Sequence, residues 1–325
     1  MQAFNLSKGL FNMNKISRFN AAVQGDPVDR PPVTSWVHFQ SDHLSAHEVA
    51  QLHLRFLEAF DWDVLKVMND FRYPVPAGVE DLSHAKVFKQ YQPLSMDEPS
   101  FVKQLACLQE IVAKVGDQVP VLETLFEPCQ QIVRNIGFDQ ADQMFNYPDE
   151  AIPALEIVTE TMCRYVEEVR KIGVQGIFLS INGAIPAHIA RGMTAEQHEH
   201  FYKKYTVEVL KAAEGMVRVV HVHGNHLQME RVLDYPCEVF SVSDRLSDNP
   251  GLAQLRKMTD KCLMGGIDES KITDRSLPAL KAEIDDALAQ AGRERFILAP
   301  GCTIPSFTSK RTLDFLRTYT QTLST

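Results

Sequence analysis

Eight short runs of apolar and β-branched residues recur along the chain, and they constrain its fold more than any other feature. They are PPVTSWVHF (31–39), WDVLKVMND (62–70), VPVLETLFE (119–127), VQGIFLSIN (174–182), VRVVHVHG (217–224), CEVFSVSD (237–244), CLMGGID (262–268) and RFILAPG (295–301). Segments with helical periodicity separate these runs, and the runs are apolar on both faces. Such strands predict a parallel sheet that is covered by helices.

The closed (β/α)8 barrel is the arrangement that we expect from this alternation. A chain of 325 residues is long enough for the fold, so we predict an α/β protein built as a single (β/α)8 TIM barrel. A doubly wound open sheet is the alternative, but no GxGxxG turn follows an early strand to support its dinucleotide-binding form. We find no internal repeat or linker. We therefore expect one domain over residues 1–325, with a helical extension over 1–25.

One connection is much longer than the others. Residues 71–97 show no clear helical period, and they are rich in aromatic residues and proline. Irregular connections of this length in compact domains are usually functional lids or disordered segments. The composition favours an ordered lid over the functional site.

Composition and charge exclude several classes of protein. The formal net charge of -9 opposes binding to nucleic acid, whose phosphates attract a positive field. No uninterrupted apolar run approaches the roughly 18 to 20 residues that span a bilayer, so we expect no membrane segment. The six cysteines form no CxxC pair, which is typical of a reducing compartment. These features predict a soluble, cytoplasmic protein with a small-molecule substrate, and they predict no particular oligomeric state.

Polar residues end almost every predicted strand, where the catalytic groups of a barrel lie. They are His38, Asp70, Glu127, Ser180, Asn182, His221, His223, Asp244, Asp268 and Cys302. Each alone could cap a loop or form a turn, but their shared location predicts a polar pocket. We expect catalytic roles for Asp70, His38 and Asp244. We expect substrate contacts from Trp36, Phe71, Arg72, Tyr73, Ser180, Asn182 and Asp268.

Three of these side chains form a candidate metal site. His221 and His223 stand two residues apart at a strand end, so both imidazoles project from the same face. Cys302 follows the last apolar run. Two imidazoles and a thiolate are the ligand set of a catalytic zinc site with one open position. The alternative is that the histidines are hydrogen-bonded structural residues and the cysteine is a small apolar one.

Four segments together resemble the uroporphyrinogen decarboxylase superfamily, which includes the zinc-dependent methylcobamide:thiol methyltransferases. They are PVDRPPV (27–33), HVHGN (221–225), GGID (265–268) and APGCTIP (299–305). The resemblance covers nearly the whole chain. It implies that His221 and Cys302 are zinc ligands and that a corrinoid, methylcobamide, is the methyl donor. His223 stands where the methyltransferase branch has a cysteine, which keeps a competent ligand type.

The decarboxylase branch of the superfamily resembles this chain less closely. Its arginine-rich RQAGRY-type stretch, which binds tetrapyrrole carboxylates, is replaced by TSWVHFQSDH (34–43) without an arginine. Asp70 matches the aspartate that holds the pyrrole nitrogens in that branch, and Arg72 is nearby. The resemblance therefore favours methyl transfer over decarboxylation.

The leading hypothesis is a zinc enzyme that moves a methyl group between a corrinoid and a thiol or related acceptor. No corrinoid-binding DxHxxG motif occurs in the sequence, so the corrinoid would be carried by a separate protein. One alternative is a metal-free decarboxylase that acts on a tetrapyrrole or a smaller carboxylate. The other is a barrel that binds a tetrapyrrole or corrinoid without catalysis.

Overall fold

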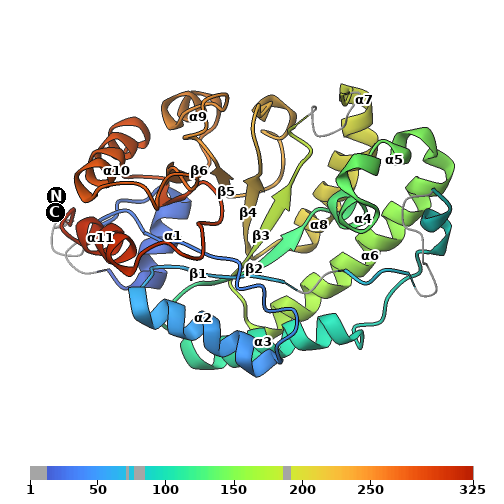
Figure 1. Ribbon diagram of the computed structural model, residues 1–325, viewed down its shortest axis with the longest axis horizontal. Helices are drawn as coiled ribbons and strands as arrows, with labels where there is room; N and C mark the ends of the chain where they lie inside the picture. The colour runs from blue at the N-terminus through green and yellow to red at the C-terminus, as the bar shows by residue number, and fades with distance from the viewer. Residues whose placement is uncertain (1–12, 71–72, 77–84, 186–191, 325) are drawn as a thin grey trace, which may run out of the picture.

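A sheet of seven parallel strands forms the centre of the molecule (Figure 1). This computed structural model describes residues 13–70, 73–76, 85–185 and 192–324. The strands are β1 (Leu65–Val67), β2 (Val121–Phe126), β3 (Gly176–Ile181), β4 (Val217–Val222), β5 (Val239–Val242), β6 (Cys262–Ile267) and β7 (Phe296–Pro300). Strands that follow one another in the sequence are neighbours in the sheet. Seven of the eight predicted runs therefore form strands, and the α/β class is confirmed.

The first predicted strand corrects the expectation of eight full strands. Of residues 31–39 only Val33 pairs with the sheet, in an isolated parallel bridge to Leu298 of β7. The carbonyl oxygen of Val33 accepts a hydrogen bond at 2.9 Å from the N–H of Asp63, which lies just before β1 at the opposite edge of the sheet. Two prolines precede Val33, and their lack of N–H groups prevents a longer ladder. The described residues thus form a curled sheet of seven strands with a single bridge between its edges.

Most of the helices cover the outer face of the curled sheet, and the first one packs across its amino-terminal end (Figure 1). They are α1 (Lys15–Gln24), α2 (Ala46–Phe60), α3 (Pro99–Val115), α4 (Pro128–Ile136), α5 (Gln143–Asn146), α6 (Pro148–Ile172), α7 (Ala195–His198), α8 (Lys204–Ala212), α9 (Leu252–Met258), α10 (Leu277–Ala291) and α11 (Lys310–Gln321). Side chains alternate between two hydrophobic clusters, because successive residues of a strand face opposite ways. In β2, Val121 and Leu125 join the cluster under the helices, and Leu122 joins the cluster inside the curl.

A buried ion-pair cluster closes the amino-terminal end of the sheet. Arg18 of α1 pairs with Asp29 at 2.6 Å and with Asp63 at 3.0 Å. Arg30 contacts both carboxylate oxygens of Asp63, at 2.5 and 2.9 Å. Arg317 of α11 approaches the same carboxylate at 3.4 Å. The charged residues of the PVDRPPV segment are thus structural, because they join α1, α11 and the start of β1.

The predicted lid and the predicted extension lie partly outside the described residues. Residues 1–12, 71–72 and 77–84 belong to that part, which includes Phe71 and Arg72. Within the predicted lid, η2 (Ala85–Gln90) is a 3-10 helix that packs against α6. Phe88 and Tyr91 are buried there. The lid itself stays a prediction. Among the described residues, no helix is both long and apolar enough to cross a bilayer.

Candidate metal centre and its cavity

The two histidines lie where β4 leaves the centre of the sheet. Strand β4 pairs with β3 on one side and β5 on the other, so its backbone is held on both edges. His221 faces into the curl and is 4% exposed, whereas Val222 faces the helices. His223 continues the pairing beyond the strand, with its N–H donating to Ile181 O at 3.1 Å. Its side chain is exposed at the mouth of the curl.

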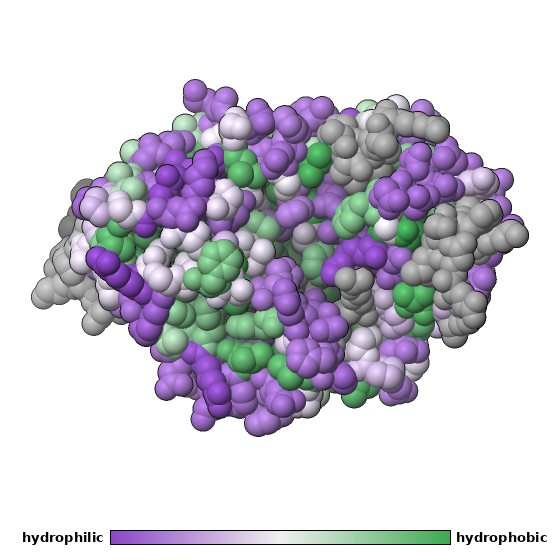
Figure 2. Space-filling view, in the orientation of Figure 1, coloured by the Kyte–Doolittle hydropathy of each residue, from purple (hydrophilic) through white to green (hydrophobic). Residues whose placement is uncertain are grey.

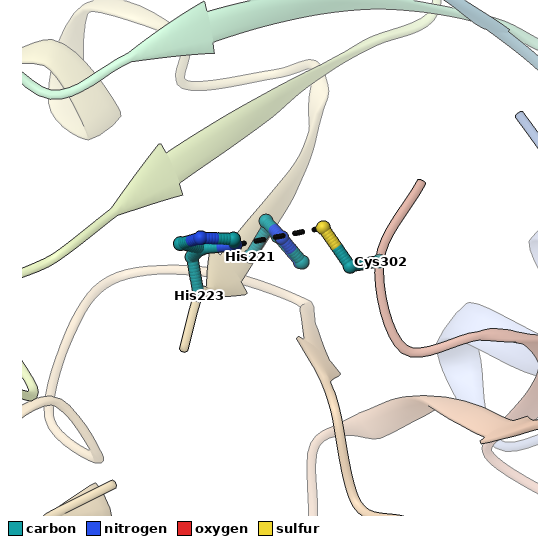
Figure 3. A group of neighbouring side chains, drawn as sticks. All are labelled: His221, His223 and Cys302. Carbon is teal, nitrogen blue, oxygen red and sulfur yellow. Dashed lines mark hydrogen bonds between the residues drawn. The ribbon is translucent and has the colours of Figure 1, made fainter. Parts of the chain in front are cut away.

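Cys302 reaches the same point from the loop after β7. Gly301 makes this path possible, because a Cβ atom there would lie 2.4 Å from Ser243 Cα. Cys302 Sγ lies 3.5 Å from His223 Nδ1. The candidate ligand atoms of His221, His223 and Cys302 all lie within 4.8 Å of one another. Figure 3 shows these three side chains gathered from two separate strand ends.

The residue types, and the distance between two of them, fit a tetrahedral zinc site. Ligands bound to zinc at about 2.0 to 2.3 Å in tetrahedral geometry stand about 3.5 Å apart, which is the distance between Cys302 and His223. His221 Nδ1 is hydrogen-bonded to Ser241 Oγ at 3.1 Å, so Nε2 is the nitrogen that remains for a metal. Such a hydrogen bond typically fixes the ring of a metal ligand.

Burial sets the protonation of these groups. It lowers the pKa of His221 well below its usual range, and the neighbouring His223 and Lys66 lower it further. Partial removal of the His223 ring from water, together with the neighbouring His38, lowers the pKa of His223. Both imidazoles are therefore neutral at pH 7, the form that binds a metal. Burial raises the pKa of the Cys302 thiol to about 11, so without a metal this residue is protonated.

A cavity of about 210 Å³ opens beside the three side chains. Its lining is Trp36, His38, Lys66, Met68, Thr124, Phe126, Gln130, Arg134, Phe138, Phe178, Ser180, His221, His223, Cys302 and Thr303. The face shown in Figure 2 is hollowed near its centre, where hydrophobic residues lie between hydrophilic ones. Trp36 and Phe178 pack around His221, with ring centroids 6.4 and 5.1 Å from the imidazole. The cavity is therefore partly aromatic and reaches the candidate metal ligands.

Four other predicted site residues join this cavity, three directly and one through a neighbour. Trp36 and Ser180 line it from the segment after the β-bridge and from the end of β3. His38 lines its mouth, and Nδ1 of His38 lies 3.0 Å from Asp70 Oδ1. Burial opposes ionisation of Asp70, but hydrogen bonds from His38 and Ser41 outweigh it and lower the pKa of Asp70 to about 2. Asp70 is therefore a carboxylate that positions His38.

The remaining described candidates do not line the cavity. Asp244 accepts a hydrogen bond from Gly266 N at 2.7 Å, which ties β5 to β6. Asp268 accepts from the N–H of Ser270 and stabilises the turn after β6.

Two further candidates also lie outside the lining of this cavity. The backbone N–H of Asn182 donates to Glu127 Oε1 at 2.5 Å. The side-chain oxygen of Asn182 is buried without a partner. Tyr73 packs in an aromatic group with Tyr91 and Phe101. Their position after a strand did not determine which way these side chains point.

Sequence reasoning missed nine residues of the cavity lining, and three of them matter most for its chemistry. Lys66 lies in the middle of β1, Arg134 in α4 and Phe178 in β3. A lysine inside a run that is otherwise apolar on both faces was a visible signal, because lysine is almost never fully buried unless it is paired. Arg134, which stacks 3.9 Å from the centroid of the Phe126 ring, had no comparable signal in the sequence.

Comparison with known proteins relates the chain to one family and several solved structures. Residues 14–322 match the family described as uroporphyrinogen decarboxylase (URO-D). No curated protein sequence matches. A methyltransferase from Methanosarcina mazei has 18% sequence identity and a TM-score of 0.78, covering 97% of this chain and all of that one.

Methionine synthases share the fold at lower similarity. A B12-independent methionine synthase from Shewanella sp. W3-18-1, in complex with selenomethionine, has 13% identity and a TM-score of 0.60 over 91% of this chain and 94% of that chain. A putative vitamin-B12-independent methionine synthase from Listeria monocytogenes has 16% identity and a TM-score of 0.59, with 92% and 97% covered. At these identities the similarity establishes the fold alone.

Proposed function

Because the chain belongs to the uroporphyrinogen decarboxylase family, we propose that it is a zinc-dependent methyltransferase acting between a corrinoid and a thiol or related acceptor. The observation that carries this proposal is the convergence of His221, His223 and Cys302 beside the cavity. Bound zinc would lower the pKa of an acceptor thiol, so that the acceptor is a nucleophilic thiolate at neutral pH. The methyltransferase from Methanosarcina mazei shares the fold, so the scaffold is compatible with this chemistry.

The residues around the site have separate tasks in this mechanism. Cys302 would hold the metal as a thiolate, and His221 would hold it as a neutral imidazole. Trp36 and Phe178 pack against His221 and limit the access of water. The Asp70 carboxylate holds Nδ1 of His38, so His38 Nε2 accepts the proton of the acceptor thiol and passes it to solvent.

Methyl transfer would occur in a single displacement reaction. The acceptor sulfur forms a bond to the methyl carbon while the bond between that carbon and the corrinoid breaks. The electron pair of the broken bond stays with the corrinoid. We propose that a separate protein presents this corrinoid at the mouth.

A decarboxylase is the second candidate, and the charge of the cavity favours it. Lys66 and Arg134 line the cavity, and no carboxylate of the described residues does. Such a lining suits a substrate that carries a carboxylate. This alternative needs no metal, so metal content separates the two candidates.

The experiment is an assay of methyl transfer with matched cysteine variants. Protein purified without chelator is supplied with zinc, methylcobalamin and a small thiol, and the loss of methylcobalamin absorbance is followed. We expect zinc-dependent turnover in the wild type and nearly none in Cys302→Ser. Cys163→Ser changes a partly exposed cysteine of α6 remote from the cluster, and should retain full activity. Equal activity of Cys302→Ser and wild type would contradict the proposal.

A further inference from the structure

Lys66 is a buried cation inside the curl of the sheet. It is 4% exposed and lies in the middle of β1, with its side chain on the same face as Met68. Its ammonium nitrogen lies 4.5 Å from the centroid of the Phe178 ring and 5.2 Å from the centroid of the Trp36 ring. Met68 Sδ, a weak acceptor, is 2.7 Å away. The ammonium therefore lies among aromatic rings and a thioether at the wall of the cavity.

No ion pair compensates this charge within the described part of the chain. Glu123, Asp70 and Cys302 act on Lys66 electrostatically, but none of them forms an ion pair with it. Glu123 is instead held by Gln104, Tyr165 and Asn69. An ammonium removed from water without an anion is costly, and rings compensate only part of this cost. Burial lowers the pKa of Lys66 to about 7 for the same reason.

The rest of the cavity has the same sign of charge. Arg134 is a second cation in its lining, and the described lining residues include no aspartate or glutamate. The whole chain has a formal net charge of -9, so this absence runs against the general composition. A cavity of about 210 Å³ with this lining selects small anions over neutral or cationic molecules.

We propose that Lys66 is a specificity-determining residue that binds a carboxylate group of the substrate. If the substrate is the acceptor thiol, this inference rests on the proposed methyl transfer. The acceptor would then place its sulfur at the metal and its carboxylate at Lys66. The ring of Phe178 is 4.5 Å from the ammonium and 5.1 Å from the centroid of His221. The ammonium of Lys66 therefore cannot lie farther from the centroid of the His221 ring than these two distances added together. The acceptor is therefore short, with a few carbon atoms between sulfur and carboxylate.

The test compares an acid with its neutral amide. Binding of 3-mercaptopropionate and of 3-mercaptopropionamide to zinc-loaded protein is measured by calorimetry. A hydrogen bond to a charged group contributes about 1.5 to 3 kcal/mol, so we expect wild type to bind the acid at least about tenfold more tightly. Lys66→Met, which preserves length but removes the charge, should bind the two alike. Lys66→Arg should retain part of the preference, and Lys171→Met, at an exposed site of α6, should retain all of it.

A second pair of ligands separates this inference from the proposed function. Pentanoate and pentanamide contain no sulfur, and their effect on the thermal midpoint reports on Lys66 whether or not zinc binds. Stabilisation by the acid alone, lost in Lys66→Met, supports the carboxylate site even if the protein holds no metal. Equal effects of acid and amide on wild type, or a preference that survives in Lys66→Met, would overturn it. Unchanged zinc content in Lys66→Met would show that the metal ligands are intact.

Discussion

Two regions of this molecule bury charged side chains, and they differ in whether those charges are paired. At the amino-terminal end of the sheet, Arg18, Arg30 and Arg317 surround Asp63, and Arg18 also holds Asp29. At the carboxyl end, Lys66 has no carboxylate partner among the described residues. The candidate ligand atoms of His221, His223 and Cys302 also lie close together there.

The difference distinguishes a structural cluster from a site prepared for ligands. Buried charges that are fully paired hold elements together and leave nothing for an outside molecule. Buried groups that lack partners destabilise the folded state until a ligand supplies them. The amino end therefore joins α1, α11 and β1, while the carboxyl end holds the groups to which we assign the proposed metal and anion.

Breaking the paired cluster should have the largest effect on stability. Asp63→Asn leaves three arginines around a neutral group, and we expect the free energy of unfolding to fall by about 3 to 5 kcal/mol. Denaturation in urea measures this change. Asp61→Asn is the matched control, because its carboxylate is 58% exposed, and it should cost less than about 1 kcal/mol. Equal losses in the two variants would remove the distinction between this cluster and ordinary surface pairs.

Removing the unpaired charge of Lys66 should stabilise the protein, which is the opposite effect. Lys66→Met should raise the free energy of unfolding by about 2 kcal/mol at pH 7, because an apolar group replaces an uncompensated ammonium. The pKa of Lys66 is lowered to about 7 in the folded state, so between pH 7 and about 10 the unfolded chain binds more protons.

Wild type should therefore gain stability as the pH rises through this window. The difference in the free energy of unfolding between Lys66→Met and wild type should become smaller. Urea denaturation at pH 7 and pH 9.5 measures both values. A destabilised Lys66→Met would mean that the ammonium has a stabilising partner.

Metal binding should depend on pH through the thiol. The pKa of Cys302 is raised to about 11 and the imidazoles are neutral, so one proton must leave when zinc binds near pH 7. We expect the affinity for zinc to rise about tenfold per pH unit between pH 6.5 and 8.5, with one proton released per ion. Calorimetry in buffers of different ionisation enthalpy counts that proton. Release of no proton would exclude Cys302 as a thiolate ligand.

The fold was largely predictable because seven apolar runs can be buried only between helices and a packed interior. The exception has a local cause: the prolines before Val33 remove the donors that a full strand needs. The family resemblance, read from four short segments, is confirmed by the match over residues 14–322. PVDRPPV carried that resemblance, although the structure gives its charges a structural place.

The site was only partly predictable, because strand ends fix where a residue lies but not what it contacts. His221 and His223 share a face by the geometry of a strand, and the curl of the sheet brings Cys302 to them. Asp244 and Asp268 occupy equivalent positions, yet backbone N–H groups of Gly266 and Ser270 hold their carboxylates away from the cavity. Lys66 was overlooked because it lies in the middle of a strand, whereas the candidates were taken from strand ends.

Metal content is the direct test of whether His221, His223 and Cys302 bind zinc. Wild type, Cys302→Ser and Cys163→Ser are purified without chelator, incubated with zinc, desalted and measured for zinc per chain. We expect about one zinc per chain in wild type and Cys163→Ser, and a small fraction of that in Cys302→Ser. Wild type that retains no zinc, or Cys302→Ser that retains as much as wild type, would contradict zinc binding by these residues.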